Sequence, residues 1–447
     1  MLKLSLWRAI AVLLLPLLIS ACGGGGSSAP PPSGGITVVP GNGQAFVTWT
    51  ADPGVDYWVV YAPTGSIANG QDLVAAAGHL WANGTAVTSP LQITGLVNGT
   101  TYTFAINGRT NGGKGGAFSA TKATLPRAAG ANWIPGSYAG TAPTSDLHGL
   151  AFGTSSADSL NYYLAVGDNG AMYKGLDGVS QSLNGYAWTP ITTAPVVNYK
   201  AAINMYSRYI SVGGGSVGGG TIVSSTDMAT WTAALWATGT SAPSYALNAL
   251  ANNGTALVAV GNHGTAYYTT DGVTWTQGTM PAGFTANLNG VAYSSYTGMW
   301  IAVGAGGALL TSTDAINWTT GSSGVSVNLN GITATTGNVL VAVGDNGTIL
   351  VNNNTMSTSA AGTWTNPTVG TTNSNALYAV STDSVQFLAV GQNGASYTSL
   401  DGLTWTVPVP VTAGSKLPTS TTLYSIFGSA SKYLGVGLAG ANFSSIN

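Results

Sequence analysis

The stretch from Leu288 to Thr319 reads LNGVAY, WIAVG, ALLTS and NWT, at residues 288–293, 300–304, 308–312 and 317–319. Each segment is short and rich in residues that favour extended backbone, and glycine-rich turns separate the segments. The stretch therefore predicts four short antiparallel strands joined by tight turns.

The same unit recurs along the rest of the chain. Its Val-Gly pair stands at residues 166–167, 212–213, 260–261, 303–304, 343–344, 390–391 and 436–437, at intervals of 40 to 48 residues. That period fits one four-stranded blade of a β-propeller. Most pairs are followed by a turn such as Asn169-Gly170, where glycine accepts the positive φ that a type I′ turn needs. The repeat predicts an all-β, seven-bladed propeller over residues 127–447.

A tryptophan closes the fourth strand of six units, at Trp188, Trp231, Trp275, Trp318, Trp364 and Trp405. The last unit, residues 423–447, ends after its third strand, whereas Asn132-Trp133-Ile134 stands alone before the first unit. We therefore expect the N-terminal strand of the repeat region to complete the final blade. Such a closure removes the open edges that a linear array would expose.

Two segments, Thr270–Trp275 and Leu400–Trp405, resemble the Asp-box (BNR) repeats of sialidase-like propellers, with one residue fewer between Asp and Trp. Asp227–Trp231 and Asp314–Trp318 are related forms. The resemblance implies that the Asp shapes a turn and that the Trp packs between blades. The repeat also looks like that of photosystem II assembly-factor propellers, a family that implies a binding protein.

Residues 36–126 predict a separate domain. Alternating segments at 45–49, 57–61 and 102–106 are typical of antiparallel strands. Leu96–Phe104 resembles the corner of a fibronectin type III domain. This resemblance implies an immunoglobulin-like β-sandwich with Trp49 in its core and the Tyr102 hydroxyl bonded to the backbone. Such domains are spacers or protein-binding modules.

The N-terminus resembles a bacterial lipoprotein signal. Lys3 and Arg8 precede an apolar run that ends Ser20-Ala21-Cys22, the form of a signal peptide over residues 1–21 followed by a lipidated Cys22. Gly23, in place of an Asp, favours the outer membrane by the same resemblance. Residues 22–35 then form a Gly/Ser/Pro tether. The expected location is the cell envelope, periplasmic or surface-exposed.

The composition excludes several classes of function. Charged residues make up 5% of the chain, the formal net charge is −2, and all thirteen acidic residues are Asp. No basic stripe exists for nucleic acid, and the single Cys allows neither an intrachain disulfide nor a Cys-based zinc site. The scarcity of Arg and the lack of Glu argue against a sialidase. We expect no catalytic residues, no metal and no cofactor.

One ring of polar residues stands out as a candidate ligand-binding site. The first strand of each blade begins Leu-x-Gly or a variant, and superposed blades would bring the x residues to one level at the mouth of a central channel. They suit a polyhydroxyl or peptide-backbone ligand, and the alternative is a water-filled channel. Turns carrying Asp168, His263, Asp345 and Gln392 are expected on the same face. The ring residues are His148, Lys200, Asn248, Asn289, Asn330, Tyr378 and Tyr424.

The sequence thus predicts a non-catalytic, lipid-anchored envelope protein. Its propeller would bind a protein or glycan in an adhesion or assembly role. The alternatives are a polysaccharide-active hydrolase or lyase on a propeller scaffold, and a structural surface component.

Overall fold

The computed structural model describes residues 27–446, except residues 42, 64–66, 68, 77, 99, 127–129, 178–186, 215–218, 336–338, 353–362, 371–373, 384–385, 409–415 and 430–431. The predicted signal peptide and Cys22 lie outside the described residues. The chain divides into two compact units, residues 1–127 and 128–446. None of the helices in the described part has the length and apolar character needed to cross a bilayer.

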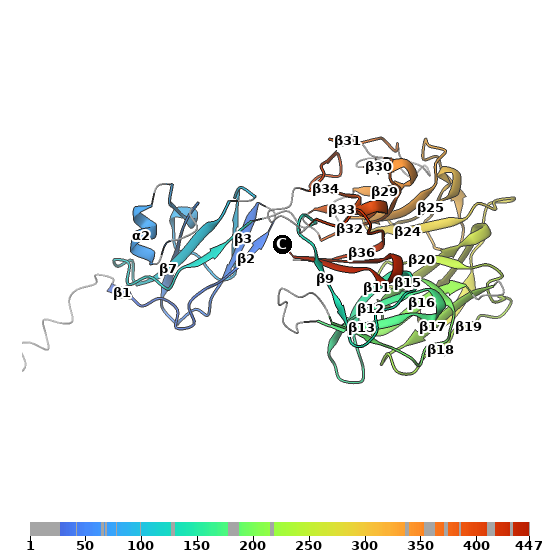
Figure 1. The fold of residues 1–447 in the computed structure, drawn as a ribbon, viewed down its shortest axis with the longest axis horizontal. Coiled ribbons are helices and arrows are strands. Elements are labelled where there is room, and N and C mark those ends of the chain that lie inside the picture. Colours follow the sequence, from blue (N-terminus) through green and yellow to red (C-terminus); the bar gives the residue numbers. More distant parts are fainter. Residues whose placement is uncertain are drawn as a thin grey trace, which may run out of the picture. The chain divides into compact units, whose positions relative to one another are not determined.

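The first unit is built from two antiparallel sheets (Figure 1). One sheet joins β2 (Thr37–Gly41), β3 (Gln44–Thr48) and β6 (Leu91–Thr94). The other has the order β1-β7-β4-β5, with β8 also paired to β7. Its members are β1 (Ser27–Ala29), β4 (Asp56–Ala62), β5 (Leu80–Trp81), β7 (Tyr102–Thr110) and β8 (Lys122–Thr124), with the helix α2 (Gly70–Ala75) between β4 and β5.

The core of this unit contains the aromatic residues that the sequence singles out. Trp49 is buried and packs edge-on against Tyr57, with ring centroids 5.9 Å apart. The Tyr102 hydroxyl accepts a hydrogen bond from the Val97 backbone N–H at 3.2 Å. That bond fixes the corner of the chain ahead of β7.

The Gly/Ser/Pro tether predicted over residues 22–35 is shorter in the structure, because part of it forms a strand. Ser27–Ala29 forms β1 and pairs with residues 108–110 of β7, so these residues belong to the sheet. Two glycines make room for it, because a Cβ on Gly108 would meet the Pro30 carbonyl and a Cβ on Gly116 would overlap that of Ala29. The Gly/Ser/Pro composition hides this strand.

The second unit contains seven antiparallel sheets among its described residues, numbered 1 to 7 along the chain. Sheet 1 contains β11 (Leu147–Thr154), β12 (Asn161–Gly167), β13 (Met172–Leu176) and β14 (Ala187–Pro190). Sheet 2 contains β15 (Asn198–Met205), β16 (Arg208–Gly214), β17 (Gly220–Ser225) and β18 (Thr232–Ala233). Sheet 3 contains β20 (Leu247–Asn252), β21 (Leu257–Gly261), β22 (Thr265–Thr269) and β23 (Thr274–Gln277).

Sheets 4 to 7 repeat the pattern. Sheet 4 contains β24 (Leu288–Ser294), β25 (Met299–Gly304), β26 (Leu309–Ser312) and β27 (Thr319–Thr320), and sheet 5 contains β28 (Leu329–Ala334), β29 (Leu340–Gly344) and β30 (Ile349–Asn352). Sheet 6 contains β32 (Leu377–Thr382), β33 (Phe387–Gly391) and β34 (Ser396–Ser399), with β35 (Thr404–Trp405) adjoining it. Sheet 7 contains β36 (Leu423–Ser429), β37 (Lys432–Gly437) and β38 (Asn442–Ile446).

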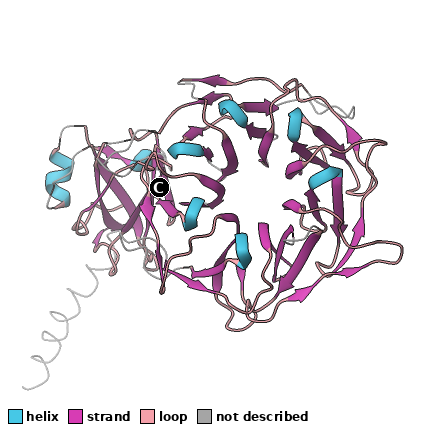
Figure 2. Ribbon diagram, turned by 45° about the vertical axis from the view of Figure 1, so that its right-hand side comes forward, coloured by secondary structure: helices cyan, strands magenta, loops and turns pink. Residues whose placement is uncertain are grey.

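The seven sheets surround one axis, with their first strands innermost (Figure 2). β9 (Ile134–Pro135) pairs antiparallel with β38, so the segment after Trp133 supplies the outer strand of sheet 7. Trp133 itself is buried, and its indole N–H donates to the Gly130 carbonyl at 2.7 Å.

Short parallel strands at the outer edges were not anticipated. β10 (Ser137–Tyr138) pairs with β14, β19 (Leu235–Trp236) with β23, and β31 (Thr368–Val369) with β35. In each case the connecting segment runs along the outer edge of the next sheet. It covers backbone groups that would otherwise be open to pairing with another chain.

The Asp and Trp of the repeat have the structural roles that the Asp-box resemblance implies. The Asp271 carboxylate accepts hydrogen bonds from the N–H groups of Val273 and Thr274 at 2.8 and 2.7 Å. Trp275 is fully buried among residues of sheets 2 and 3, including Ile210. The turn and the inter-sheet packing therefore come from one short motif.

Candidate binding site at the channel mouth

Each ring residue predicted from the sequence is the extra residue of a β-bulge. In sheet 1, Leu147 pairs with Gly167 and Gly149 pairs with Val166, which leaves His148 without a partner across the ladder. The same shift interrupts the first strand of every sheet at the ring residue. A bulge bends the strand and redirects the extra side chain. This local geometry turns seven side chains toward the axis.

The glycine of each Val-Gly pair is required by this bulge. Gly304 has extended backbone, with φ of −170°, so conformation alone would admit another residue. The available space excludes a larger residue, because a Cβ on Gly304 would overlap the carbonyl oxygen of Asn287 opposite. The same overlap with the opposite carbonyl occurs at Gly167, Gly213, Gly261, Gly344, Gly391 and Gly437.

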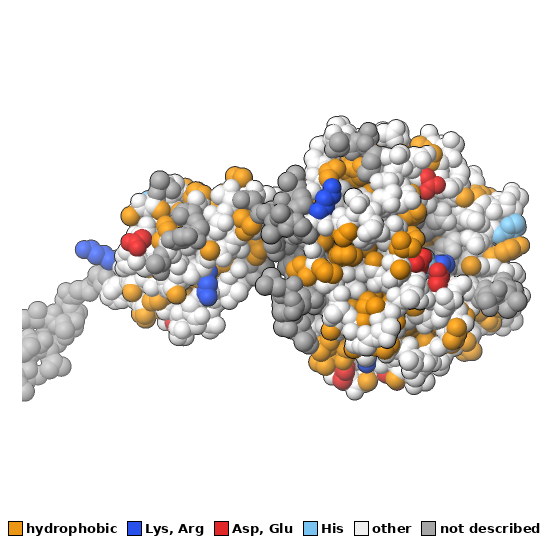
Figure 3. Space-filling model, in the orientation of Figure 1, with side chains coloured by type: hydrophobic (Ala, Val, Ile, Leu, Met, Phe, Trp, Pro, Cys, Tyr) orange, Lys and Arg blue, Asp and Glu red, His pale blue; other side chains and the backbone are white. Residues whose placement is uncertain are grey.

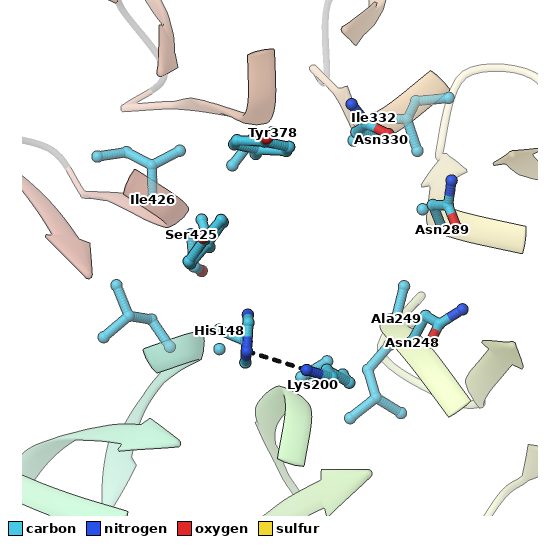
Figure 4. Close-up of a pocket in the computed structure, with 18 of the residues that line it drawn as sticks. His148, Lys200, Asn248, Ala249, Asn289, Asn330, Ile332, Tyr378, Ser425 and Ile426 are labelled. Carbon is cyan, nitrogen blue, oxygen red and sulfur yellow. Dashed lines mark hydrogen bonds between the residues drawn. The ribbon is translucent and has the colours of Figure 1, made fainter. Parts of the chain in front are cut away.

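The seven ring residues line one cavity of about 390 Å³ (Figure 4). Small residues follow them in the chain, since the first strands of neighbouring sheets lie close together. A Cβ on Gly149, for example, would come within 2.8 Å of the backbone of Ala201. Two residues further along each first strand lies an apolar collar, formed by Leu150, Ala202, Leu250, Val291, Ile332, Val380 and Ile426. The cavity thus has a polar mouth above an apolar collar.

Sheets 3 to 5 carry asparagines that hold neighbouring sheets together; we name this set the amide arc. The side-chain amides of Asn248, Asn289 and Asn330 donate to the carbonyl of the leucine before the next ring residue, at 2.9, 3.0 and 3.0 Å. These leucines are Leu288, Leu329 and Leu377. The amide arc therefore has a structural role at the mouth.

Sheets 6, 7, 1 and 2 carry a different set, which we name the charged arc: Tyr378, Tyr424, His148 and Lys200, with Asp168 beside them. The Lys200 ammonium lies 2.8 Å from Asp168 Oδ1 and 2.9 Å from His148 Nε2, and His148 Nε2 lies 3.0 Å from Asp168 Oδ2. The side chains of His148, Asp168 and Lys200 are 17%, 27% and 33% exposed. One imidazole nitrogen therefore faces both a carboxylate and an ammonium that solvent can reach.

The protonation of this cluster follows from burial and hydrogen bonding. Burial lowers the pKa of His148, and the hydrogen bond with Asp168 opposes that effect only in part, so the imidazole is neutral at pH 7. Burial would raise the pKa of Asp168, but hydrogen bonds from Lys200 and His148 outweigh it and hold the pKa below its usual range. The cluster is a neutral imidazole beside an ammonium–carboxylate pair.

The rings of the two tyrosines and of His148 follow one another along the charged arc. The Tyr378 and Tyr424 rings are 5.2 Å apart, and the Tyr424 and His148 rings are 5.0 Å apart. Burial raises the pKa of both phenols, and the nearby Asp345 and Asp146 carboxylates raise the pKa of Tyr378 and Tyr424 further. Both hydroxyls stay protonated and can donate hydrogen bonds.

Asp146, which no motif in the sequence marks, completes the charged arc. Its Oδ1 accepts a hydrogen bond at 2.8 Å from the Ala439 N–H in the turn of sheet 7. Asn287 and Asn328 accept the equivalent bond from the turns of sheets 3 and 4. Sheet 1 thus has a carboxylate at a position where other sheets use a neutral amide.

Comparisons with solved structures identify the fold of most of the chain. No protein-family model matches the sequence, and no curated protein matches it. Among solved structures, the chain is similar to "YCF48 bound to D1 peptide", at 17% identity and a TM-score of 0.51, over 70% of this chain and 94% of that one.

Two further structures give the same result. YCF48 from Cyanidioschyzon merolae is 18% identical, with a TM-score of 0.51 over 71% of this chain and 99% of that one. The WD40 β-propeller domain of Doa1 is 10% identical, with a TM-score of 0.51 over 71% and 96%. The chain contains a β-propeller. At these identities the likeness concerns the fold alone.

The turns that follow the Val-Gly pairs lie at the mouth of the propeller, as expected. Positive φ at Asn169 and Gly170, with a bond from Ala171 N–H to Asp168 O, matches the predicted type I′ turn. In sheet 3, however, the residue equivalent to Asp168 is Asn262, which bonds Asn248 at 2.8 Å. His263 is the next residue and stacks on Tyr245 instead, with centroids 4.5 Å apart.

The propeller mouth contains one group, among the described residues, with the donor atoms of a metal site. Donor atoms of Asp146, His148 and Asp168 lie within 4.8 Å of one another. Two of these three residues, however, already contact the Lys200 ammonium at hydrogen-bond distance. The cluster therefore already binds a cation of the protein itself, the Lys200 ammonium, and its chemistry suits positively charged groups.

Proposed function

We propose that this chain is a non-catalytic, lipid-anchored protein of the bacterial cell envelope whose propeller mouth binds a segment of a partner protein. The observation that carries the proposal is the division of the ring into two arcs. The amide arc serves the contacts between sheets. All seven ring residues line the cavity, but in the charged arc the Lys200 ammonium contacts the partly exposed side chains of His148 and Asp168, and Tyr378 and Tyr424 add two phenols to the lining.

The similar structure that holds a peptide supports a protein segment as the ligand class, since it has the same fold. A glycan is the alternative partner, because phenols, amides and an ammonium also suit hydroxyl groups. The pairing of β9 with β38 supports a seven-bladed ring closed by its N-terminal strand. Trp49 and the Tyr102 corner bond support a fibronectin type III domain in the first unit, which we propose is a spacer.

The proposed location rests on the sequence of residues 1–23 alone. Lipid on Cys22 would anchor the protein in the outer membrane, in the periplasm or at the cell surface. A purely structural surface role or a polysaccharide-active enzyme would leave the charged arc without a protein partner.

A pull-down from envelope extracts tests the binding function. The bait is purified protein that contains both compact units, as wild type and as the variant His148→Ala, Lys200→Ala, Tyr378→Ala. Tyr296→Ala is the matched control, because Tyr296 is 69% exposed and follows the far end of β24.

We expect wild type and control to retain a common partner that the triple variant loses while its melting temperature shows that it is folded. The isolated partner must then bind wild type directly. Loss of the partner after protease treatment of the extract identifies a protein, and retention identifies a glycan. Equal retention by all three baits would overturn the binding role of the ring.

A further inference from the structure

The mouth of the propeller carries more negative charge than its own cation neutralises. Lys200 is the one lysine or arginine among the described residues that line the cavity. Three carboxylates lie at the mouth: Asp168 and Asp146 in the charged arc, and Asp345, which accepts a bond from Asn330 at 2.9 Å. With His148 neutral, the three carboxylates and the one ammonium leave an excess of two negative charges at the mouth. Charged side chains are few in this chain, as the face drawn in Figure 3 shows.

The structural contact of Asp146, the hydrogen bond from the Ala439 N–H, does not require a negative charge. In sheet 5 the equivalent residue is Asn328, whose amide donates to Asp345 at 2.9 Å while its oxygen accepts from Gly306 N–H. In sheet 1 the corresponding pair is Asp146 and Asp168, two carboxylates with oxygens within 4.8 Å of each other. An asparagine would satisfy the turn equally well and would remove the repulsion. Natural proteins keep such unfavourable arrangements at functional sites.

The surroundings of this charge define what it can bind. The Tyr378 and Tyr424 rings lie 5.2 Å apart at the mouth, and aromatic rings attract cations. Asp345 and Asp146 are near enough to raise the pKa of Tyr378 and Tyr424, respectively. The collar lies two residues further along each strand, roughly 7 Å deeper, and accepts apolar groups. A ligand that fits both levels has a positive group at the mouth and an apolar side chain below it.

Resting on the proposed function, we propose that the mouth recognises a cationic group of its protein partner next to an apolar side chain. The cation is an ammonium or guanidinium held by Asp146 and the adjacent tyrosine rings, with Asp345 adding to the negative field at the mouth, and the apolar side chain enters the collar. Two sources supply this chemistry: the α-ammonium of a peptide N-terminus with an apolar first residue, and a Lys or Arg that follows an apolar residue.

Four fluorescent peptides separate these sources. All have one leucine in an otherwise Gly/Ser sequence, with the dye at the C-terminus. The first has a free N-terminal leucine, the second is N-acetylated, and the third and fourth are acetylated with lysine or norleucine after the leucine. Fluorescence anisotropy gives the dissociation constant of each for protein containing both compact units.

We expect one cationic peptide to bind about tenfold more tightly than its neutral match, since a charge-assisted hydrogen bond gives at least that factor. Higher salt should reduce the preference. Asp146→Asn and Asp345→Asn should each lower it severalfold, and Lys200→Met, which removes the resident cation, should raise it. Asp158→Asn, the same change in an exposed loop at the other end of sheet 1, is the control.

The opposite response of the Lys200 and Asp146 variants is diagnostic, because damage to the fold would weaken binding in both. Equal affinity for charged and neutral peptides, or a preference that survives Asp146→Asn and Asp345→Asn, would overturn the inference. Absence of binding by every peptide would overturn it as well. The binding function would still stand if the pull-down retained a partner through the charged arc, so failure of the two proposals can be told apart.

Discussion

The amide arc and the charged arc occupy the same bulge position in one ring, yet they differ in what their side chains contact. Asn289 donates to the Leu329 backbone carbonyl of the next sheet, whereas Lys200 contacts the partly exposed side chains of His148 and Asp168 in the preceding sheet. Backbone geometry is common to both arcs, so the difference lies in side-chain chemistry: the amide arc bonds backbone carbonyls, and the charged arc brings ionisable side chains together. The comparison indicates that stability and binding can be changed independently at one position of the repeat.

The largest effect should come from breaking the bulge that both arcs share. Gly304→Ala in sheet 4 and Gly167→Ala in sheet 1 each force a methyl group against an opposite carbonyl. We expect either change to lower the free energy of unfolding by about 3 kcal/mol, the upper range for overpacking. Urea denaturation measures it. A loss in one sheet only would mean that the bulge does not have the same role in both arcs.

Removal of one amide should separate the arcs. Asn289→Ala deletes the hydrogen bond to Leu329 and should lower the free energy of unfolding by about 1 kcal/mol. Partner retention in the pull-down should not change. Loss of the partner with unchanged stability would assign Asn289 to the binding surface instead.

A change in the opposite direction is expected at Asp146. Asp146→Asn replaces a carboxylate pair by the amide–carboxylate arrangement seen between Asn328 and Asp345. Stability should rise by about 0.5 kcal/mol, the size of a modest like-charge repulsion. Thermal unfolding at low salt gives the clearest measurement. A fall in melting temperature would show that the second carboxylate oxygen is needed by the fold.

The smallest effect concerns pH. Since the pKa of His148 in the folded protein lies below its ordinary value of 6.5, the unfolded chain takes up a proton more readily. As pH falls below 6.5, the free energy of unfolding should therefore decrease, and above that pH this group should have no influence. His148→Gln should flatten the difference between pH 8 and pH 5. An unaltered pH profile in the variant would assign the dependence to other groups.

The repeat can be inferred from the sequence because local backbone geometry determines its key residues. Val-Gly, the following turn and the Asp-to-Trp motif each act within one sheet or between neighbours, so the spacing of the repeat is enough to align the seven ring residues. The role of Asp146 is hidden, since its partner Ala439 lies almost the whole length of the propeller away in sequence. The same distance effect conceals β1, which pairs with residues more than 75 positions further along.

Chemistry within the ring is harder to infer than position. The sequence predicts the three asparagines as ligand-binding groups and gives no sign that each amide also donates to a leucine carbonyl of the next sheet. His263 looks equivalent to Asp168 because both lie in the same turn, whereas a one-residue difference puts Asn262 at the mouth. Spacing locates a side chain only to within a residue, and a turn changes its direction at each residue.

The pairing of β9 with β38 has a consequence for how the chain becomes a finished molecule. Ile134 pairs with Ser444, so this contact joins the earliest and latest parts of the second unit. During synthesis, Trp133 and its strand must wait until nearly all other sheets have been made. Because the entropic cost of loop closure rises with the length of the intervening chain, we expect this pairing to form after the pairings within each sheet. The earlier sheets, once formed, shorten the effective loop, so the order of synthesis itself prepares the closure.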